Sequence, residues 1–170
     1  LLLSNDFALL ERAKSYSNFG FMGSRQSIEI GINAKLSEFH AAVGLGAMDV
    51  WHMNRQQYYQ KAMVYLEMID NNICLQEGWG ATWISSNCVV RFENKEHKNA
   101  AQSLLKTKDI QSRDWWNQGC HQEPIFQKIR VLNNLDNTRK LAEITLGIPF
   151  YRDIDIDSIK EVVETLNQAV

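Results

Sequence analysis

The chain has 170 residues, of which 45% are hydrophobic and 22% are charged, and this balance is ordinary for a globular protein with one sizeable core. Its formal net charge of −2, with acidic and basic residues interspersed, argues against a nucleic-acid-binding protein, because such proteins need a positive field to displace counterions from phosphates. No apolar stretch approaches the ~20 residues that span a bilayer, so no transmembrane helix and no membrane partner are expected.

The three cysteines, Cys74, Cys88 and Cys120, are odd in number and widely spaced. This pattern fits a reducing compartment better than a disulfide framework, and we expect a cytoplasmic protein. No His-x-x-x-His or Cys-x-x-Cys spacing is present, so no metal site is predicted. The adjacent His121 leaves a Cys–His nucleophilic pair open, but a buried or loop thiol is the commoner state of such a cysteine.

In chain order, residues 1–3 are predicted to form a short buried strand. Asn5 or Asp6 then caps a helix that ends near Gly20, a plausible left-handed terminator. Residues 21–31 combine glycines with a polar run and are predicted to be a loop. Because the chain begins in the middle of an element, we expect further chain upstream.

A long helix is predicted from Ser37, its cap, through residues 38–69, because apolar residues recur there at spacings of 3, 4 and 7. Gly44 and Gly46 weaken it locally by ~1 kcal/mol each. At 1.5 Å per residue the helix is roughly 45 Å long, enough to connect two domains.

The rest of the chain alternates between strands and helices. The predicted elements are strands at residues 88–92 and 110–116, helices at 96–106 and 138–144 (capped by Asn137 or Thr138), a loop-rich excursion at 118–137, an extended segment at 148–150, and a last helix capped by Asp155 or Asp157. This order predicts an α/β or α+β fold whose last ~85 residues form a small sheet with helices on one face.

Asn33 and Lys35 lie just before the helix that Ser37 caps. The free N–H groups and the positive end of the helix dipole favour an anion there. Asn33 can donate a hydrogen bond to a phosphate oxygen, and Lys35 adds a positive charge. The alternative, which is commoner in proteins, is a well-capped helix start with two solvated polar residues.

A second dense segment runs from Arg113 to His121. Trp115 and Trp116 are candidates for an aromatic shelf under a ring-shaped ligand, and Arg113 for a bidentate clamp on a phosphate or carboxylate. The alternative is that the two rings straddle the sheet, one in the core and one under a loop, while Arg113 faces water.

Residues 31–45, Gly-Ile-Asn-Ala-Lys-Leu-Ser-Glu-Phe-His-Ala-Ala-Val-Gly-Leu, resemble the Gly-x-Asn-x-(Arg/Lys)-(Met/Leu)-(Ser/Asp)-Glu-x-x-Ala-Ala-x-Gly-Leu stretch of the DegT/DnrJ/EryC1/StrS aminotransferases. Residues 18–20 are similar to the end of that family's Arg-Asn-His-Gly pattern, with Phe in place of its His. Residues 110–116 resemble its Ile-x-Thr-Arg strand, and residues 119–126 resemble its Cys-His-x-x-Pro-x-(Phe/Tyr) loop. The resemblance spans nearly the whole chain in family order.

The resemblance implies a type I aminotransferase fold that uses pyridoxal 5'-phosphate (PLP) and works as a homodimer. Residues 1–33 would then be a remnant of the large PLP-binding domain, and residues 34–170 the linking helix and the small C-terminal domain. The implied reaction moves an amino group from glutamate to a keto sugar on a nucleotide carrier, for amino-sugar and polysaccharide biosynthesis. The family's cofactor lysine lies ahead of Leu1, so the chain alone is expected to be inactive.

By the same resemblance, Asn33 reaches the cofactor phosphate of the partner subunit, and residues 21–30 border the neighbour's active site. Arg113 and His121 fall in segments that enclose the sugar nucleotide, and Lys35 is assigned with them to substrate binding. No residue of the chain is assigned a catalytic role. The alternative interpretation is a non-catalytic binding or assembly module that uses the small sheet and an aromatic pocket.

Overall fold

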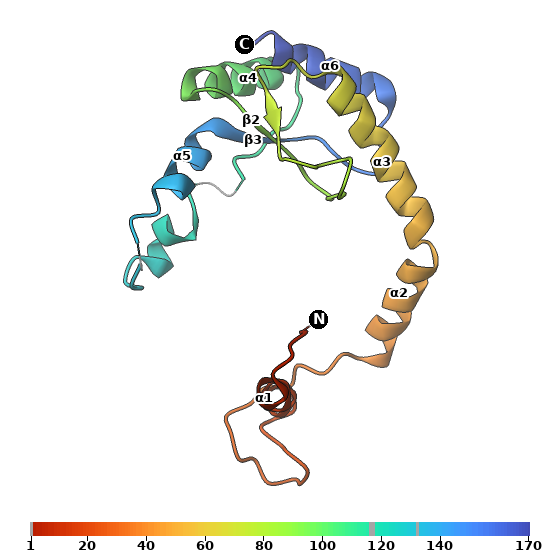
Figure 1. Cartoon of the computed structure of the whole chain (residues 1–170), viewed down its shortest axis with the longest axis vertical. Coiled ribbons are helices and arrows are strands. Elements are labelled where there is room, and N and C mark those ends of the chain that lie inside the picture. Colours follow the sequence, from red (N-terminus) through yellow and green to blue (C-terminus); the bar gives the residue numbers. More distant parts are fainter. Residues whose placement is uncertain (1, 116–117, 132) are drawn as a thin grey trace. The chain divides into compact units, whose positions relative to one another are not determined.

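The computed structural model describes residues 2–115, 118–131 and 133–170. The chain divides into two compact units, an N-terminal unit of residues 1–50 and a C-terminal unit of residues 51–170 (Figure 1). The domain boundary predicted from the resemblance, between residues 33 and 34, falls inside the N-terminal unit. The assignment of residues 1–33 to a large PLP-binding domain stays a prediction.

The first helix, α1 (Phe7–Ser17), has the predicted start and end. The Asp6 carboxylate accepts a hydrogen bond from the Leu9 N–H at 3.1 Å, and Gly20 has the expected left-handed backbone, with φ of 77°. The strand predicted at residues 1–3 is wrong for its described part, since residues 2 and 3 are exposed and pair with no strand, and Leu1 lies outside the described residues.

The predicted long helix is two helices, α2 (Glu38–Asp49) and α3 (Trp51–Met68), which belong to different units. The Ser37 hydroxyl caps α2 as predicted, accepting from the His40 N–H at 3.2 Å. Val50 ends α2 because its backbone, with φ of −100° and ψ of 7°, leaves the helical region. The prediction of one uninterrupted helix over residues 38–69 is therefore wrong, because Val50 separates two helices.

The C-terminal unit holds a three-stranded antiparallel sheet in the order β1-β2-β3. Its strands are β1 (Cys74–Leu75), β2 (Cys88–Arg91) and β3 (Thr145–Ile148), and its helices after α3 are α4 (Lys95–Thr107), the short 3-10 turns η1 (Cys120–Gln122) and η2 (Pro124–Phe126), α5 (Asp136–Ile144) and α6 (Ile156–Asn167). Helices α4 and α6 pack against each other, α3 packs on α6, and α5 packs on α4 (Figure 1). The predicted small sheet with packed helices is confirmed.

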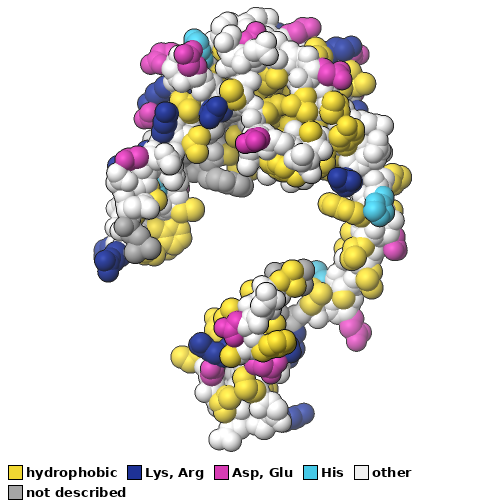
Figure 2. All heavy atoms as spheres, in the orientation of Figure 1, with side chains coloured by type: hydrophobic (Ala, Val, Ile, Leu, Met, Phe, Trp, Pro, Cys, Tyr) yellow, Lys and Arg dark blue, Asp and Glu magenta, His cyan; other side chains and the backbone are white. Residues whose placement is uncertain are grey.

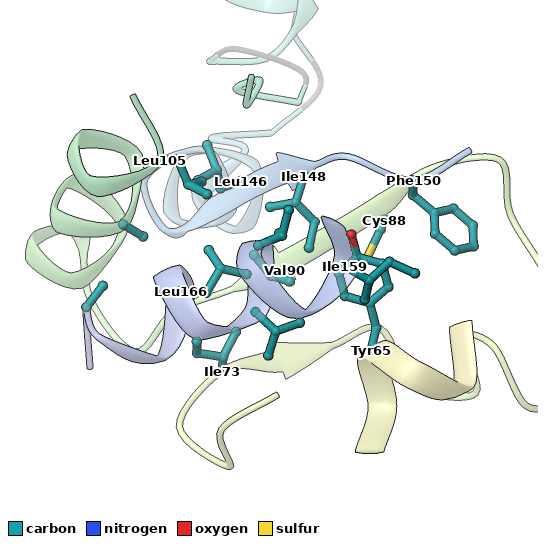
Figure 3. Close-up of a cluster of buried hydrophobic side chains, with 14 of the residues drawn as sticks. Tyr65, Ile73, Cys88, Val90, Leu105, Leu146, Ile148, Phe150, Ile159 and Leu166 are labelled. Atoms are coloured by element: carbon teal, nitrogen blue, oxygen red, sulfur yellow. The ribbon is translucent and has the colours of Figure 1, made fainter. Parts of the chain in front are cut away.

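The core is formed by the sheet together with side chains of α3, α4 and α6 (Figure 3). Strand residues that alternate along β2, Cys88 and Val90, are buried with Leu146 of β3, as the two-residue period of a strand requires. The Tyr65 hydroxyl of α3 donates a hydrogen bond to the Pro149 carbonyl at the rim of this core. Burial raises the pKa of both the Tyr65 hydroxyl and the Cys88 thiol, so both groups are neutral at pH 7.

The strand predicted at residues 110–116 is wrong for its described part, residues 110–115, because within it only Arg113 pairs with the sheet; Trp116 lies outside the described residues. The Arg113 N–H donates to the Gly147 carbonyl at 2.9 Å, and the Gly147 N–H donates to the Arg113 carbonyl at 2.7 Å. The Trp115 ring then packs over Gly147, where an added Cβ would lie 1.8 Å from the Trp115 Cδ1 atom. The third strand is instead β3, which overlaps the predicted extended segment only at Ile148.

The start of α5 also differs from the prediction. Leu135, with a left-handed φ of 54°, precedes the helix, and neither Asn137 nor Thr138 caps it. Asp155 caps α6 as predicted, and its accepted hydrogen bonds, from the Ser158 N–H first, lower the pKa of its carboxyl group. Within the described ranges no helix combines the length and apolar character needed to cross a bilayer.

The ion pair between Lys98 and Asp114 ties the Arg113–Trp115 segment to α4. Lys98 is only 8% exposed, and its Nζ atom lies 2.5 Å from the Asp114 carboxylate. Since a buried ammonium group without a counter-charge is strongly disfavoured, this contact holds the segment against the helix.

We expect Lys98→Met to lower the free energy of unfolding by about 1–2 kcal/mol, less than the loss for a fully buried pair because Asp114 keeps partial access to water. The measurement is urea unfolding followed by circular dichroism. The control is Lys95→Met, because the Lys95–Glu143 pair is longer, at 3.8 Å, and is more than half exposed on both sides. The control should lose less than about 0.5 kcal/mol, and equal losses would contradict the anchoring role of Lys98.

Candidate functional site

Residues 32–34 form an ordered segment because they pair with the end of α1. Asn18 and Asn33 form an antiparallel bridge, and the Phe19 N–H donates to the Ile32 carbonyl at 3.1 Å. Backbone hydrogen bonds from residues 32 and 34 to the last turn of α1 flank this bridge. The predicted anion-binding segment is therefore fixed in position by backbone contacts that sequence reasoning did not anticipate.

The side chains of Asn33 and Lys35 differ in how they are used. The Asn33 side chain is exposed, and its amide makes no hydrogen bond within the described part of the chain. The Lys35 Nζ atom donates to the Asn18 Oδ1 atom at 3.0 Å and lies 4.6 Å from the centroid of the Phe19 ring. The structure thus brings both predicted residues onto one short segment, with the amide free and the ammonium engaged.

Two glycines allow the loop of residues 21–30 to return over the end of α1. An added Cβ on Gly31 would lie 2.1 Å from the Gly20 backbone nitrogen, and one on Gly20 would lie 1.9 Å from the Glu29 carbonyl oxygen. The Ser27 hydroxyl lies within hydrogen-bonding distance of both the Phe19 and the Glu29 carbonyl oxygens, at 2.9 and 2.8 Å. Any side chain at either glycine would prevent this closure, so the loop is anchored at both ends.

In the C-terminal unit, Arg113 and Trp115 line a cavity of about 620 Å³, which lies in the ~300–1,000 Å³ range of small-molecule sites. The guanidinium carbon of Arg113 lies 5.7 Å from the centroid of the Trp115 ring. Other polar residues that line the cavity include Asn87, Asp109, Gln111, Ser112, Ser158 and Glu161. Trp115 therefore packs on the sheet edge and also faces the predicted clamp, whereas Trp116, the other half of the predicted shelf, lies outside the described residues.

His121 occupies η1 and does not line this cavity. Its Nε2 atom lies 3.2 Å from the Nε2 atom of Gln122, and no hydrogen bond or ion pair among the described residues joins it to Arg113. Among the described residues, the exposed Cys120 thiol forms no hydrogen bond with His121, so these two side chains do not form an activated Cys–His pair in this structure. The described residues also contain no group of three or more His, Cys, Asp or Glu side chains that could hold a metal ion.

The sequence matches the DegT/DnrJ/EryC1/StrS aminotransferase family over residues 1–167. Protein Rv3402c of Mycobacterium tuberculosis (strain ATCC 25618 / H37Rv) is 28% identical to it over 175 residues, a region that covers 99% of this chain and 42% of that protein. The chain therefore spans less than half the length of this relative.

Two solved structures illustrate the likeness in three dimensions. DesI, crystallised in the presence of its TDP-sugar product, gives a TM-score of 0.80 at 23% identity, over 98% of this chain and 44% of that chain. NtdA from Bacillus subtilis with bound cofactor PMP gives a TM-score of 0.78 at 19% identity, over 98% of this chain and 40% of that chain. The predicted PLP-aminotransferase type of fold is confirmed. Since the family match covers almost every residue, the chain belongs to the DegT/DnrJ/EryC1/StrS aminotransferase family.

Proposed function

We propose that this chain is the C-terminal portion of a PLP-dependent aminotransferase that moves an amino group from glutamate to a keto sugar carried on a nucleotide. Family membership supports the reaction class, and the similar DesI was crystallised with a TDP-sugar product. The observation that carries the proposal is the exposed Asn33 amide, which is held on an ordered segment and has no hydrogen-bond partner within the described residues.

The residues around Asn33 fit a phosphate group. A phosphate accepts hydrogen bonds and carries negative charge, whereas the Asn33 amide offers N–H donors and Lys35 places a positive charge two residues away. When bound, PLP supplies an electron sink for charge that develops on the substrate carbon. Asn33 would hold the phosphate of the cofactor in the partner subunit, in a site whose lysine lies in the cofactor-binding half of the parent protein.

A homodimer is supported by the apolar surface of the N-terminal unit (Figure 2). Helix α2 buries none of its residues within its own unit, and its Phe39, Val43 and Met48 side chains are all exposed. The loop of residues 21–30 adds Ile30, which is 89% exposed. Apolar exposure of this kind marks a surface that other protein covers. We assign that role to the partner subunit and to the rest of the large domain.

The cavity beside Arg113 is the proposed wall of the nucleotide-sugar site. The Arg113 guanidinium can bind phosphate oxygens in a bidentate fashion, and the Trp115 ring offers a flat apolar face. His121 is proposed as a further substrate contact from η1. Every residue that lines the cavity belongs to the C-terminal unit, which is the feature that favours the alternative of a non-catalytic binding module.

In the protein that includes the cofactor-binding half, Asn33→Ala should weaken PLP binding by about 10- to 100-fold, because a hydrogen bond to a charged group contributes roughly 1.5–3 kcal/mol. The loss is measured by fluorescence titration of the apoenzyme. Asn33→Asp should lose more, because it adds a negative charge beside the phosphate. The matched control is Asn5→Ala, a substitution at an exposed residue of the same unit. Unchanged PLP affinity in Asn33→Ala would contradict the assignment.

The same variant tests whether Asn33 acts across the dimer. A heterodimer is formed from an Asn33→Ala subunit and a subunit that lacks the cofactor lysine. Such a pair should regain one site of normal PLP affinity, because the intact lysine and the intact Asn33 then meet in one active site. Retention of PLP only at the affinity of Asn33→Ala would show that Asn33 acts within its own subunit.

Arg113→Ala should raise the KM for the nucleotide sugar by about 10- to 100-fold, because the phosphates lose a bidentate contact, whereas a rise confined to the glutamate half-reaction would instead assign Arg113 to a glutamate carboxylate. Steady-state and single-half-reaction kinetics separate the two effects. Arg91→Ala is the control, since Arg91 is an exposed arginine of β2 that does not line the cavity. If both half-reactions keep their KM values, the cavity is not part of the substrate wall.

The isolated chain of residues 1–170 should fail to form a specific PLP adduct. After incubation with PLP and reduction with borohydride, intact-mass and peptide analysis should find low, scattered modification of several lysines. Neither Lys14 nor Lys35 matches the position of the family's cofactor lysine. A stoichiometric adduct at one lysine would contradict the assignment of the catalytic lysine to another part of the protein.

A further inference from the structure

The turn that follows α1 is strained at Phe19. Its φ of 59° places a bulky aromatic residue in the left-handed region, which is rare for residues other than Gly, Asn and Asp. Such a conformation persists only where surrounding contacts hold it, and it is found most often at functional sites. Gly20, the next residue, adopts its φ of 77° without this cost.

Lys35 supplies contacts that hold the turn. Its ammonium lies 4.6 Å from the centroid of the Phe19 ring, a cation–π distance, and donates to the side-chain oxygen of Asn18 at 3.0 Å. The Phe19 N–H in turn donates to the Ile32 carbonyl. Lys35 therefore contacts both Asn18 and Phe19, the two residues of the turn that pair directly with the segment of residues 32–34.

The position of Asn33 depends on this arrangement. Asn33 lies opposite Asn18 in the backbone bridge and two residues before Lys35 in the chain. When the ammonium is removed, Asn18 loses its charged partner and the Phe19 ring loses the cation beside it. The backbone bridge that fixes Asn33 then depends on a turn whose conformation at Phe19 is unfavourable and no longer supported by Lys35.

We propose that Lys35 is a positioning residue, whose contacts with Asn18 and Phe19 hold the turn that aims the Asn33 amide at the cofactor phosphate. This inference rests on the proposed function of Asn33. The positioning role takes the place of the direct substrate contact that the resemblance implied for Lys35, because its ammonium already contacts the Phe19 ring and the Asn18 side-chain oxygen. A direct contact with a phosphate or substrate would require Lys35 to leave the Phe19 ring.

A double-mutant cycle distinguishes the two roles. In the full-length protein, Lys35→Met and Phe19→Leu should each weaken PLP binding by roughly 3- to 10-fold, and the double variant should be no weaker than the worse single variant. Lys35→Arg should restore most of the affinity, because a guanidinium also stacks on an aromatic ring. The control is Lys14→Met, an exposed lysine of α1 that pairs with Glu11, which should bind PLP as the parent does.

Losses that multiply in the double variant would overturn the proposal and assign Lys35 a direct contact that is independent of Phe19. Amide hydrogen exchange provides a second readout that does not depend on PLP. In the apoenzyme, Lys35→Met should speed exchange of the Phe19 and Ile32 amides by at least about 10-fold, whereas Lys14→Met should not. Unchanged exchange overturns the inference even where Asn33→Ala loses affinity, and unchanged affinity in Asn33→Ala overturns the proposed function.

Discussion

The geometry of the N-terminal unit depends on one backbone constraint, the pairing of residues 32–34 with the end of α1. The pairing requires left-handed backbone at Phe19 and Gly20 and leaves no room for a side chain at Gly31. It also closes the loop of residues 21–30 at both ends. The exposed apolar side chains of that loop are therefore presented on an anchored structure, which favours a defined contact with another protein surface.

A comparable constraint organises the cavity wall of the C-terminal unit. Arg113 exchanges two backbone hydrogen bonds with Gly147, the Trp115 ring packs on that glycine, and Asp114 pairs with Lys98 of α4. Alternate residues of this short segment are thus attached to the sheet and to a helix. These contacts fix the backbone that carries Arg113, so binding of the proposed anionic ligand would need little reordering of the main chain there.

The elements that depend on local interactions could be predicted from the sequence. The Ser37 and Asp155 caps are examples, because a cap needs only a side-chain oxygen and the next helical turn. The contacts between distant residues could not. Residues 110–116 alternate like a strand in sequence, yet in the described part, residues 110–115, only Arg113 forms a bridge, and the Trp115 ring packs on Gly147. Apolar periodicity likewise continues through Val50 and gives no sign of the break there. Asn33 was predicted as an anion contact from its place before the Ser37 cap and from the family motif, whereas the left-handed backbone at Phe19 carries no local signal.

The two units differ in how much apolar surface they bury, and therefore in how far burial alone can keep each of them folded. Among the described residues of the N-terminal unit, only Ser15 and Gly20 are buried, whereas the C-terminal unit holds the whole hydrophobic core cluster. Because burial of apolar surface is what offsets the entropy of ordering a chain, the unit that carries Asn33 needs surface from elsewhere to remain folded. Binding that covers α2 and the loop, and binding of phosphate at Asn33, would each stabilise the same folded unit. Linkage then requires that the two binding events favour one another. Under the proposed function, dimerisation and cofactor retention are therefore expected to be coupled.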